Sequence, residues 1–177
     1  MALYFVRHGE STNNAKNLFS GRANPSLTKK GEEQAIKTAR EIKDLVEISH
    51  VISSPLDRAV RTAEIIAEAI GYEKPIETDE RIIEYDLGEL ESTTWHKIPK
   101  EEFSKIKGIE PPAKFRARLI DFLNEHKNKN SNILIVGHGG VYRMIEASRL
   151  KLDPASFQEV DRPGNASYIE LDISWLD

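Results

Sequence analysis

Basic and imidazole side chains follow three apolar segments of this chain, close to the point where each segment ends. Arg7 and His8 follow the letters LYFV, Arg58 comes soon after VISS, and His138 follows ILIVG. Two guanidinium groups favour an anion, because their planar donors match the oxygens of a phosphate or a carboxylate in pairs. An imidazole beside them can act as a nucleophile. These residue types predict an anion site with catalytic potential, and phosphate is the first candidate.

The three apolar segments are of the kind found in strands buried on both faces, at 3–6, 51–54 and 133–137. Helical patterns lie between them, and alternating polarity from Tyr168 onward adds a final strand. This alternation predicts an α/β fold, a three-layer α/β/α sandwich with a mostly parallel central sheet. Ligands bind at the carboxyl ends of such strands, where the N-termini of helices at Ser54 and Gly139 would add backbone N–H donors. We therefore expect the basic and imidazole side chains to converge on one pocket.

Two of the expected helices carry clear N-terminal signals. The first follows Thr28, a suitable N-cap, and its apolar positions are Ala35, Ala39, Ile42 and Leu45. The second opens with SPLD, where Ser54 is the expected N-cap, and Gly71 ends it. Further helices are expected over about 113–126 and 140–150. The helix that follows Thr28 is expected to cover the sheet.

The stretch from 79 to about 112 has no long periodicity, because Gly and Pro residues interrupt it. We expect a variable loop with short helices there, and a single domain over 1–177 whose short cap spans about 85–112. The cap either lines the entrance to the pocket or forms a small packed flap with solvated lysines. The residues concerned are Trp95, His96, Lys97, Phe103 and Lys105.

The composition narrows the classes of partner. The 177 residues carry a formal net charge of -4 and no cysteine. A slightly acidic chain has no overall attraction to nucleic acid or to an anionic membrane, so neither is expected as a partner. Without cysteine there is no disulfide scaffold, thiolate nucleophile or cysteine-ligated metal. No apolar run approaches the ~20 residues that span a bilayer, and we expect a cytoplasmic monomer or homodimer.

A metal site is the rival interpretation of the same residues. His8, His138 and a carboxylate such as Glu84 are common ligands of zinc and iron. The neighbouring arginines argue against it, because two nearby guanidinium charges would oppose a divalent cation by several kcal/mol at an effective dielectric constant near ~20. We therefore expect no metal.

Several motifs, in a common order along most of the chain, resemble those of the histidine phosphatase superfamily, which includes cofactor-dependent phosphoglycerate mutases and many small phosphatases. They are VRHGES, FSG, SLTKKGEEQA, SSPLDRAVRTAE, DERIIEYDLGELE and VGHGG. The resemblance implies a phosphoglycerate mutase-like fold in which His8 becomes phosphorylated, Glu84 donates a proton, and the phosphate pocket is completed by Arg7, Arg58 and His138. It also implies that Asn14, Ser20 and Gly21 contact the phosphoryl group or the substrate.

The implied roles agree with elementary chemistry. Arg7 and Arg58 disfavour protonation of His8, which keeps its ring neutral and nucleophilic near neutral pH. The same cations hold phosphate oxygens and offset charge during transfer. Glu84 can protonate the leaving alkoxide and then activate the water that cleaves the phosphohistidine. No cofactor is required for such a hydrolysis.

Two departures from the mutase pattern favour hydrolysis over mutation. The segment between Glu84 and His138 is short, so the longer insertion whose paired arginines hold the substrate carboxylate in mutases has no clear counterpart. Gly-Gly, rather than Gly-Asn, follows His138. We expect a phosphatase acting on a small phosphorylated metabolite. The alternatives are a phosphoglycerate mutase that needs 2,3-bisphosphoglycerate as its cofactor, and a phosphate-binding module without catalysis.

Overall fold

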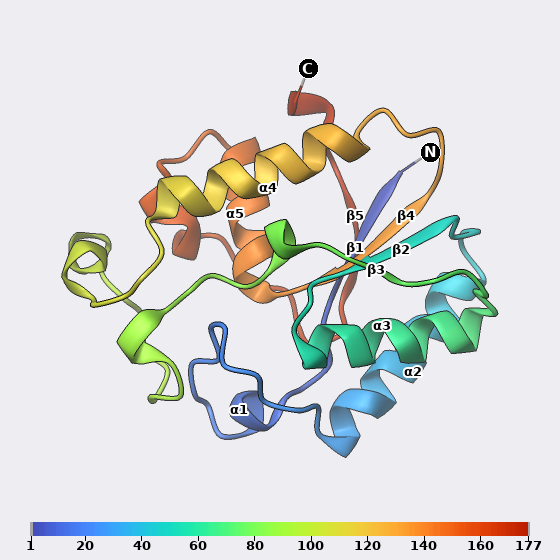
Figure 1. Cartoon of the computed structure of the whole chain (residues 1–177), viewed down its shortest axis with the longest axis horizontal. Coiled ribbons are helices and arrows are strands. Elements are labelled where there is room, and N and C mark those ends of the chain that lie inside the picture. Colours follow the sequence, from blue (N-terminus) through green and yellow to red (C-terminus); the bar gives the residue numbers. More distant parts are fainter. Residues whose placement is uncertain (1, 177) are drawn as a thin grey trace.

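The computed structural model describes residues 2–176, without the side chains of Lys100, Phe103 and Ser104. Its centre is a five-stranded sheet in the order β3-β2-β4-β1-β5 (Figure 1). Strands β1 to β4 are parallel, and β5 runs antiparallel to β1 at one edge. The expected mostly parallel sheet is confirmed. The strands are β1 (Leu3–Arg7), β2 (His50–Ser53), β3 (Glu77–Thr78), β4 (Ile133–Gly137) and β5 (Tyr168–Leu171).

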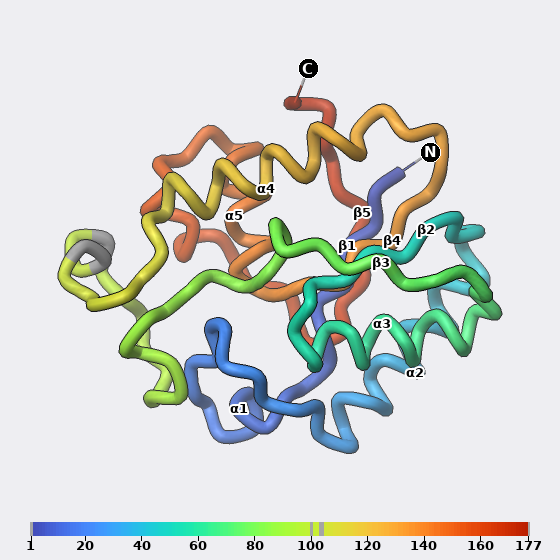
Figure 2. Tube along the Cα trace, viewed as in Figure 1, coloured from blue at the N-terminus to red at the C-terminus, as the bar shows by residue number. Residues whose placement is uncertain are grey.

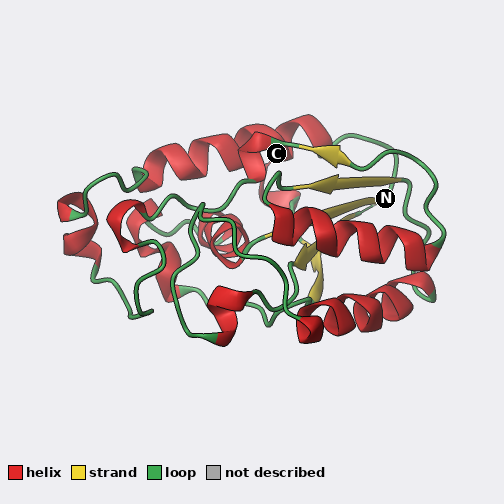
Figure 3. Cartoon of the chain, turned by 60° about the horizontal axis from the view of Figure 1, so that its bottom comes forward, coloured by secondary structure: helices red, strands yellow, loops and turns green. Residues whose placement is uncertain are grey.

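Helices cover both faces of this sheet, as Figure 3 shows. The longer helices are α2 (Lys29–Lys43), α3 (Asp57–Ile70), α4 (Pro112–His126) and α5 (Gly139–Arg149). In β4, Ile133 and Ile135 pack in one core with α4 and α5. Leu134 and Val136 point the opposite way, because successive side chains of a strand alternate, and they pack in a second core with α2 and α3. The three-layer α/β/α sandwich is therefore confirmed.

Helix α2 begins where the sequence indicates and ends before Leu45. Thr28 is its N-cap, and the Thr28 hydroxyl accepts a hydrogen bond from the backbone N–H of Gly31 at 3.0 Å. The expected apolar positions are fully buried at Ala35, Ala39 and Ile42. The prediction for Leu45 is wrong: the helix ends at Lys43, so Leu45 lies beyond it with 69% of its surface exposed.

Helix α3 starts later than its sequence signal suggests. Its N-cap is Leu56, which makes no side-chain capping bond, so the prediction that Ser54 caps this helix is wrong. The helix begins two residues later than a Ser54 cap requires, and the Ser54 hydroxyl, which lies 2.7 Å from Nε2 of His138, accepts only a long 3.4 Å hydrogen bond from the N–H of Leu56. Gly71 ends the helix as expected, with a φ of 77° that suits glycine. The serine therefore belongs to the carboxyl edge of the sheet.

The stretch between α3 and α4 is a loop with short 3-10 helices, as expected. Figure 2 shows its green and yellow part extending away from the sheet. The sequence did not predict β3, which has two exposed residues and is too short to show a period. In the part of the chain that the structure describes, no helix has the length and apolar character needed to cross a bilayer. The short helices are α1 (Thr12–Ala15) and the 3-10 segments Glu80–Ile82, Gly88–Leu90, Lys100–Lys105, Pro154–Glu159 and Ser174–Leu176.

Candidate active site

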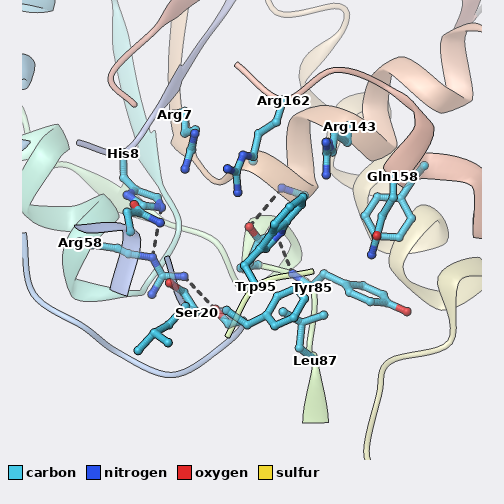
Figure 4. A pocket seen from close by; sticks show the side chains of 18 residues that line it. Arg7, His8, Ser20, Arg58, Tyr85, Leu87, Trp95, Arg143, Gln158 and Arg162 are labelled. Carbon is cyan, nitrogen blue, oxygen red and sulfur yellow. Dashed lines mark hydrogen bonds between the residues drawn. The ribbon is translucent and has the colours of Figure 1, made fainter. Parts of the chain in front are cut away.

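Four side chains meet at the carboxyl edge of the sheet, and Figure 4 shows three of them, Arg7, His8 and Arg58. Arg7 ends β1 and His8 follows it, while Arg58 lies in the first turn of α3 and His138 follows β4. The His8 and His138 rings have centroids 5.2 Å apart, and Nε of Arg58 donates to Nε2 of His8 at 3.2 Å. The structure therefore brings together the four residues that follow the three strands.

His8 is held in one tautomer. Its Nδ1 lies 2.7 Å from the carbonyl oxygen of Gly9, and because a carbonyl only accepts, Nδ1 carries the proton. Nε2 then has a lone pair, which accepts the hydrogen bond from Arg58. Burial, followed by the charges of Arg58 and Arg7, holds the pKa of His8 well below its usual value. The ring is therefore neutral at neutral pH, and Nε2 is its nucleophilic atom.

Arg7 and Arg58 are buried cations that backbone carbonyls hold in place. Arg58 donates to the carbonyl oxygens of Ala23 and Gly21, each at 2.8 Å, and Arg7 donates to that of Pro163 at 2.7 Å. Burial lowers the pKa of Arg7 to about 9 and that of Arg58 to about 10, so both stay charged at neutral pH. A neutral carbonyl does not balance a guanidinium charge, so the pocket favours an anion.

His138 is fully buried against His8 and does not itself line the pocket. Its Nε2 lies 2.7 Å from the Ser54 hydroxyl, and its Nδ1 is buried without a hydrogen-bond partner among the described residues. Burial, followed by the charge of Arg58, keeps the pKa of His138 well below its usual value. The sequence indicated Ser54 at this edge only as the start of a helix, and it did not reveal the contact of the Ser54 hydroxyl with His138, because a serine directly before proline is a strong capping signal.

We expect the free energy of unfolding to fall as the pH is lowered from about 7.5 to about 5.5. His8 and His138 stay neutral in the folded chain, whereas in the unfolded chain they take up protons below a pKa of about 6.5. Because the unfolded state then binds more protons, stability is full above that pH and decreases below it by about 1.4 kcal/mol per pH unit for each histidine. Urea unfolding at the two pH values measures the change.

The matched variants separate the buried histidines from the rest of the chain. His138→Gln should lose about one histidine's share of this pH dependence. His96→Gln should keep all of it, because the His96 side chain is exposed. An unchanged pH dependence in His138→Gln would contradict a neutral, buried His138.

Glu84 reaches the pocket from the loop after the 3-10 helix at Glu80–Ile82. Its two carboxylate oxygens accept hydrogen bonds from the backbone N–H groups of Tyr85 at 2.9 Å and Gly140 at 3.1 Å. A Cβ atom at Gly140 would lie 2.3 Å from a carboxylate oxygen, so glycine is needed for this contact. The carboxylate thus lies at the N-terminus of α5, where the helix dipole stabilises negative charge.

Two arginines fix the backbone of Glu84. Arg118 and Arg22 both donate to its carbonyl oxygen, at 3.1 Å and 3.4 Å. Both also contact the buried carboxylate of Glu110, at 2.9 Å from Nε of Arg118 and 3.3 Å from Arg22. Because Arg118 belongs to α4, this network ties the candidate acid to a long helix.

The predicted binding residues lie around the same pocket. Those that line it are Asn14, Ser20, Gly21 and Gly139. Nδ2 of Asn165 donates to Oδ1 of Asn14 at 3.0 Å and to the carbonyl oxygen of His8 at 3.2 Å. The Ser20 hydroxyl is buried with no partner among the described residues, which leaves it to serve a ligand. Gly139 is the first residue of α5, so its N–H belongs to the helix N-terminus.

A carboxylate of the cap holds the loop beside Arg58. The two oxygens of Glu91 accept hydrogen bonds from the backbone N–H groups of Arg22 at 2.6 Å and Ala23 at 2.7 Å. The same loop carries the Gly21 and Ala23 carbonyls that bind Arg58. A contact from the cap therefore positions a guanidinium group of the pocket.

Further polar residues line the pocket that the sequence did not indicate, namely Arg143, Gln158 and Arg162. Arg143 lies one turn after Gly139 in α5, so helical spacing is the signal that could have found it. Gln158 lies in a 3-10 helix and Arg162 in the loop before β5, where no pattern marks them. A pair of arginines thus comes from segments that follow His138, rather than from an insertion before it.

Both interpretations of the cap are correct in part. Trp95 lines the pocket with 39% of its surface exposed. The His96 ring packs edge-on against the buried ring of Phe19, with 5.3 Å between the ring centroids. Lys97 and Lys105 are exposed, as in the packed flap with solvated lysines. The side chain of Phe103 lies outside the described residues. The cap therefore contributes two aromatic side chains to the pocket lining, those of Tyr85 and Trp95, together with Leu87.

The positions of His8, His138 and Glu84 bear on the rival interpretation of a metal site. Within residues 2–176, no three His, Asp or Glu side chains are grouped so that they could hold a metal ion. The Glu84 carboxylate is bound by backbone N–H groups, and Nδ1 of His8 donates to a carbonyl. These hydrogen bonds occupy both oxygens of Glu84 and one ring nitrogen of His8.

Comparisons with known proteins agree with the motifs and the fold. The family model for the histidine phosphatase superfamily (branch 1) matches residues 3–174. The probable phosphoglycerate mutase GpmB of Escherichia coli O1:K1 is 43% identical over 99% of this chain and 88% of that protein. A mutant phosphoserine phosphatase from Entamoeba histolytica in complex with phosphoserine is 26% identical, with a TM-score of 0.76 over 94% of this chain and 87% of that chain. A mycobacterial glucosyl-3-phosphoglycerate phosphatase, 24% identical, supports the fold with a TM-score of 0.79 over 96% and 92% of the two chains.

Proposed function

Because the chain belongs to the histidine phosphatase superfamily, we propose that it hydrolyses a small phosphomonoester through a phosphohistidine on His8, without a metal. One observation carries this proposal: Nδ1 of the buried His8 donates to the Gly9 carbonyl, which leaves a neutral Nε2 beside two guanidinium groups. A histidine that only bound phosphate would gain from being charged. A neutral ring among cations is instead suited to attack phosphorus.

In the first step, the guanidinium groups of Arg7 and Arg58 bind the phosphoryl oxygens. Arg58 exchanges its hydrogen bond to Nε2 of His8 for a phosphate oxygen, which frees the lone pair of Nε2. Nε2 attacks phosphorus, the ester P–O bond breaks, and its electron pair stays on the leaving oxygen. That oxygen takes a proton from the carboxyl of Glu84, whose protonated form the neighbouring phosphate dianion favours.

In the second step, Glu84 acts as a base. Its carboxylate takes a proton from a water molecule, and the water oxygen attacks the phosphorus of the phosphohistidine. The N–P bond breaks, and its electron pair returns to Nε2 of His8. The backbone N–H groups of Tyr85 and Gly140 hold the carboxylate in place for both steps.

The mutase alternative is kept because the curated relative of Escherichia coli is named a probable phosphoglycerate mutase. A mutase must keep its phosphohistidine from water until the intermediate binds again, so its site must close. Here the cap contributes Tyr85, Leu87 and Trp95 to the pocket, and Trp95 is itself partly exposed. This access for water favours hydrolysis.

We expect p-nitrophenyl phosphate to be hydrolysed at an unchanged rate when a chelator such as EDTA is present, because the arginines take the place of a metal as the positive charge. Release of p-nitrophenolate and of inorganic phosphate measures this. A loss of activity that added metal restores would contradict the metal-independent mechanism. Conversion of 3-phosphoglycerate to 2-phosphoglycerate with added 2,3-bisphosphoglycerate, faster than phosphate release, would favour the mutase. Phosphate binding without turnover would favour the non-catalytic module.

A further inference from the structure

The pocket contains more positive charge than one phosphoryl group requires. Its lining includes Arg143 and Arg162 in addition to Arg7 and Arg58. Four guanidinium groups exceed the two negative charges of a phosphate dianion even when the carboxylate of Glu84, which also lines the pocket, is added. Arg58 donates to Nε2 of His8, and the charges of Arg58 and Arg7 act on the His8 ring more strongly than that of Arg162. We therefore assign binding at the reacting phosphorus to Arg7 and Arg58. Arg143 is left without a role in that step, and the charge of Arg162 has only a smaller effect there.

Neither guanidinium of the second pair, Arg143 and Arg162, is held in an ion pair by the described residues, although the charges of Glu84 and Asp161 act on Arg143 from a greater distance. Within residues 2–176, Arg143 and Arg162 make no ion pair and no hydrogen bond with a side chain or a carbonyl. Nε of Arg143 is buried, and burial followed by the charge of Arg162 lowers the pKa of Arg143. Leaving cations close together and unpaired in a partly buried position is costly unless an anion joins them.

The second pair continues the pocket away from His8. In Figure 4, the side chains of Arg7, Arg162 and Arg143 point into the same space, with Arg162 between the other two. The charge of Arg162 acts on both of its neighbours, lowering the pKa of each, which agrees with this order. Arg143 is one helical turn, about 6 Å of rise, along α5 from Gly139. An anion held by Arg143 is therefore displaced from the phosphoryl site.

Arg162 is supported on both sides by other residues of the pocket. Its aliphatic part packs on Gly139, where a Cβ atom would lie 2.6 Å from Cδ of Arg162. Its guanidinium carbon lies 5.9 Å from the centre of the Trp95 ring, a cation–π contact. These contacts hold the exposed side chain of Arg162 over the pocket.

We propose that Arg143 and Arg162 bind a second anionic group of the substrate, a carboxylate or a second phosphate, a few atoms from the phosphorus that His8 attacks. This inference rests on the proposed phosphatase function and names its substrate class, phosphomonoesters with a further negative charge. A guanidinium binds either anion through paired N–H donors.

Binding of non-hydrolysable phosphonates tests the inference without requiring turnover. Isothermal titration compares propylphosphonate, which has only the phosphonate, with 3-phosphonopropionate and with propane-1,3-bisphosphonate. We expect one or both of the doubly anionic compounds to bind about 10- to 100-fold more tightly than propylphosphonate. Arg143→Gln and Arg162→Gln should each remove most of this gain and leave the affinity for propylphosphonate within about twofold.

Arg149→Gln is the matched control, because Arg149 lies on the same helix, pairs with Glu146 at 2.8 Å and does not line the pocket. Arg149→Gln should keep the full gain in affinity for the doubly anionic compounds. Circular dichroism should show that Arg143→Gln, Arg162→Gln and Arg149→Gln are all folded. A gain for the carboxylate alone identifies a carboxylate as the second group, and a gain for the bisphosphonate alone identifies a phosphate.

The outcomes separate this inference from the function on which it rests. Equal affinities for all three compounds would overturn the inference, and so would a gain that survives both Arg143→Gln and Arg162→Gln. In either case propylphosphonate binding and p-nitrophenyl phosphate hydrolysis would leave the proposed function intact. If propylphosphonate itself does not bind and p-nitrophenyl phosphate is not hydrolysed, both the phosphatase proposal and the second anion site are rejected.

Discussion

Replacing His8 with alanine is expected to reduce the kcat for p-nitrophenyl phosphate by roughly 10⁴-fold or more, because it removes the only nucleophile of the proposed mechanism. The effect should be the same for substrates with good and poor leaving groups, since both pass through the N–P bond on Nε2. Initial rates of p-nitrophenolate release measure it. Brief reaction with a radiolabelled phosphomonoester, stopped with alkali, should label the wild-type chain and leave His8→Ala unlabelled.

The matched control is His50→Ala. His50 starts β2, so it lies at the amino edge of the sheet, away from the pocket. It should retain activity within about twofold and keep the phosphohistidine label. If His8→Ala retained more than a tenth of the wild-type kcat, or if it still carried the label, the assignment of His8 as nucleophile would be wrong.

Glu84→Gln is expected to act differently on alkyl and aryl phosphates. An alkyl phosphate leaves as a strongly basic alkoxide, so its turnover should fall about 10²- to 10⁴-fold when the proton donor is lost. p-Nitrophenolate leaves without a proton, so Glu84→Gln should still transfer the phosphoryl group to His8. It then lacks the base that activates water, and the phosphohistidine accumulates. Stopped-flow absorbance should show one equivalent of p-nitrophenolate released rapidly, followed by a slow steady rate.

Glu80→Gln provides the control for this variant, because Glu80 lies in the same segment with an exposed side chain. It should show neither the burst nor the loss of alkyl phosphatase activity. A uniform decrease for both substrate classes without a burst would assign Glu84 a structural role. The hydrogen bonds that its carboxylate accepts from Tyr85 and Gly140 provide such a role.

The sheet could be predicted because its central strands are buried on both faces. In β4, alternate residues enter the two separate cores, so the whole segment is apolar and stands out from the polar chain around it. The convergence of Arg7, His8 and His138 then follows from parallel pairing, in which Arg7 of β1 lies opposite Gly137 of β4. Edge strand β3 could not be predicted, because its two exposed residues carry no pattern.

The periphery of the site was less predictable, for reasons that differ from residue to residue. The Ser54 hydroxyl contacts His138, which lies far along the chain, whereas the local sequence around Ser54 predicts a helix N-cap. Arg162 lies in irregular chain, and only the packing of that loop beside Gly139 brings it over the pocket. Motifs at strand ends indicate the reacting groups, whereas contacts that recognise the rest of a substrate depend on how distant loops meet.

The hydrogen bonds between Glu91 and the loop of Arg22 and Ala23 divide the cap into two parts. The two parts differ in how freely their sequences can change without displacing that loop. Suppose that the cap is replaced by that of a relative, starting at a residue before Glu91. If Glu91 is lost, the loop that holds Arg58 loses its hydrogen bonds, and both the rate of catalysis and the substrate specificity would change. If the replacement instead starts just after Glu91, those hydrogen bonds remain and Trp95, which lines the pocket, is exchanged. Changes to the cap after Glu91 can therefore alter which substrates bind without disturbing Arg58. Changes that remove Glu91 affect both substrate binding and the position of Arg58.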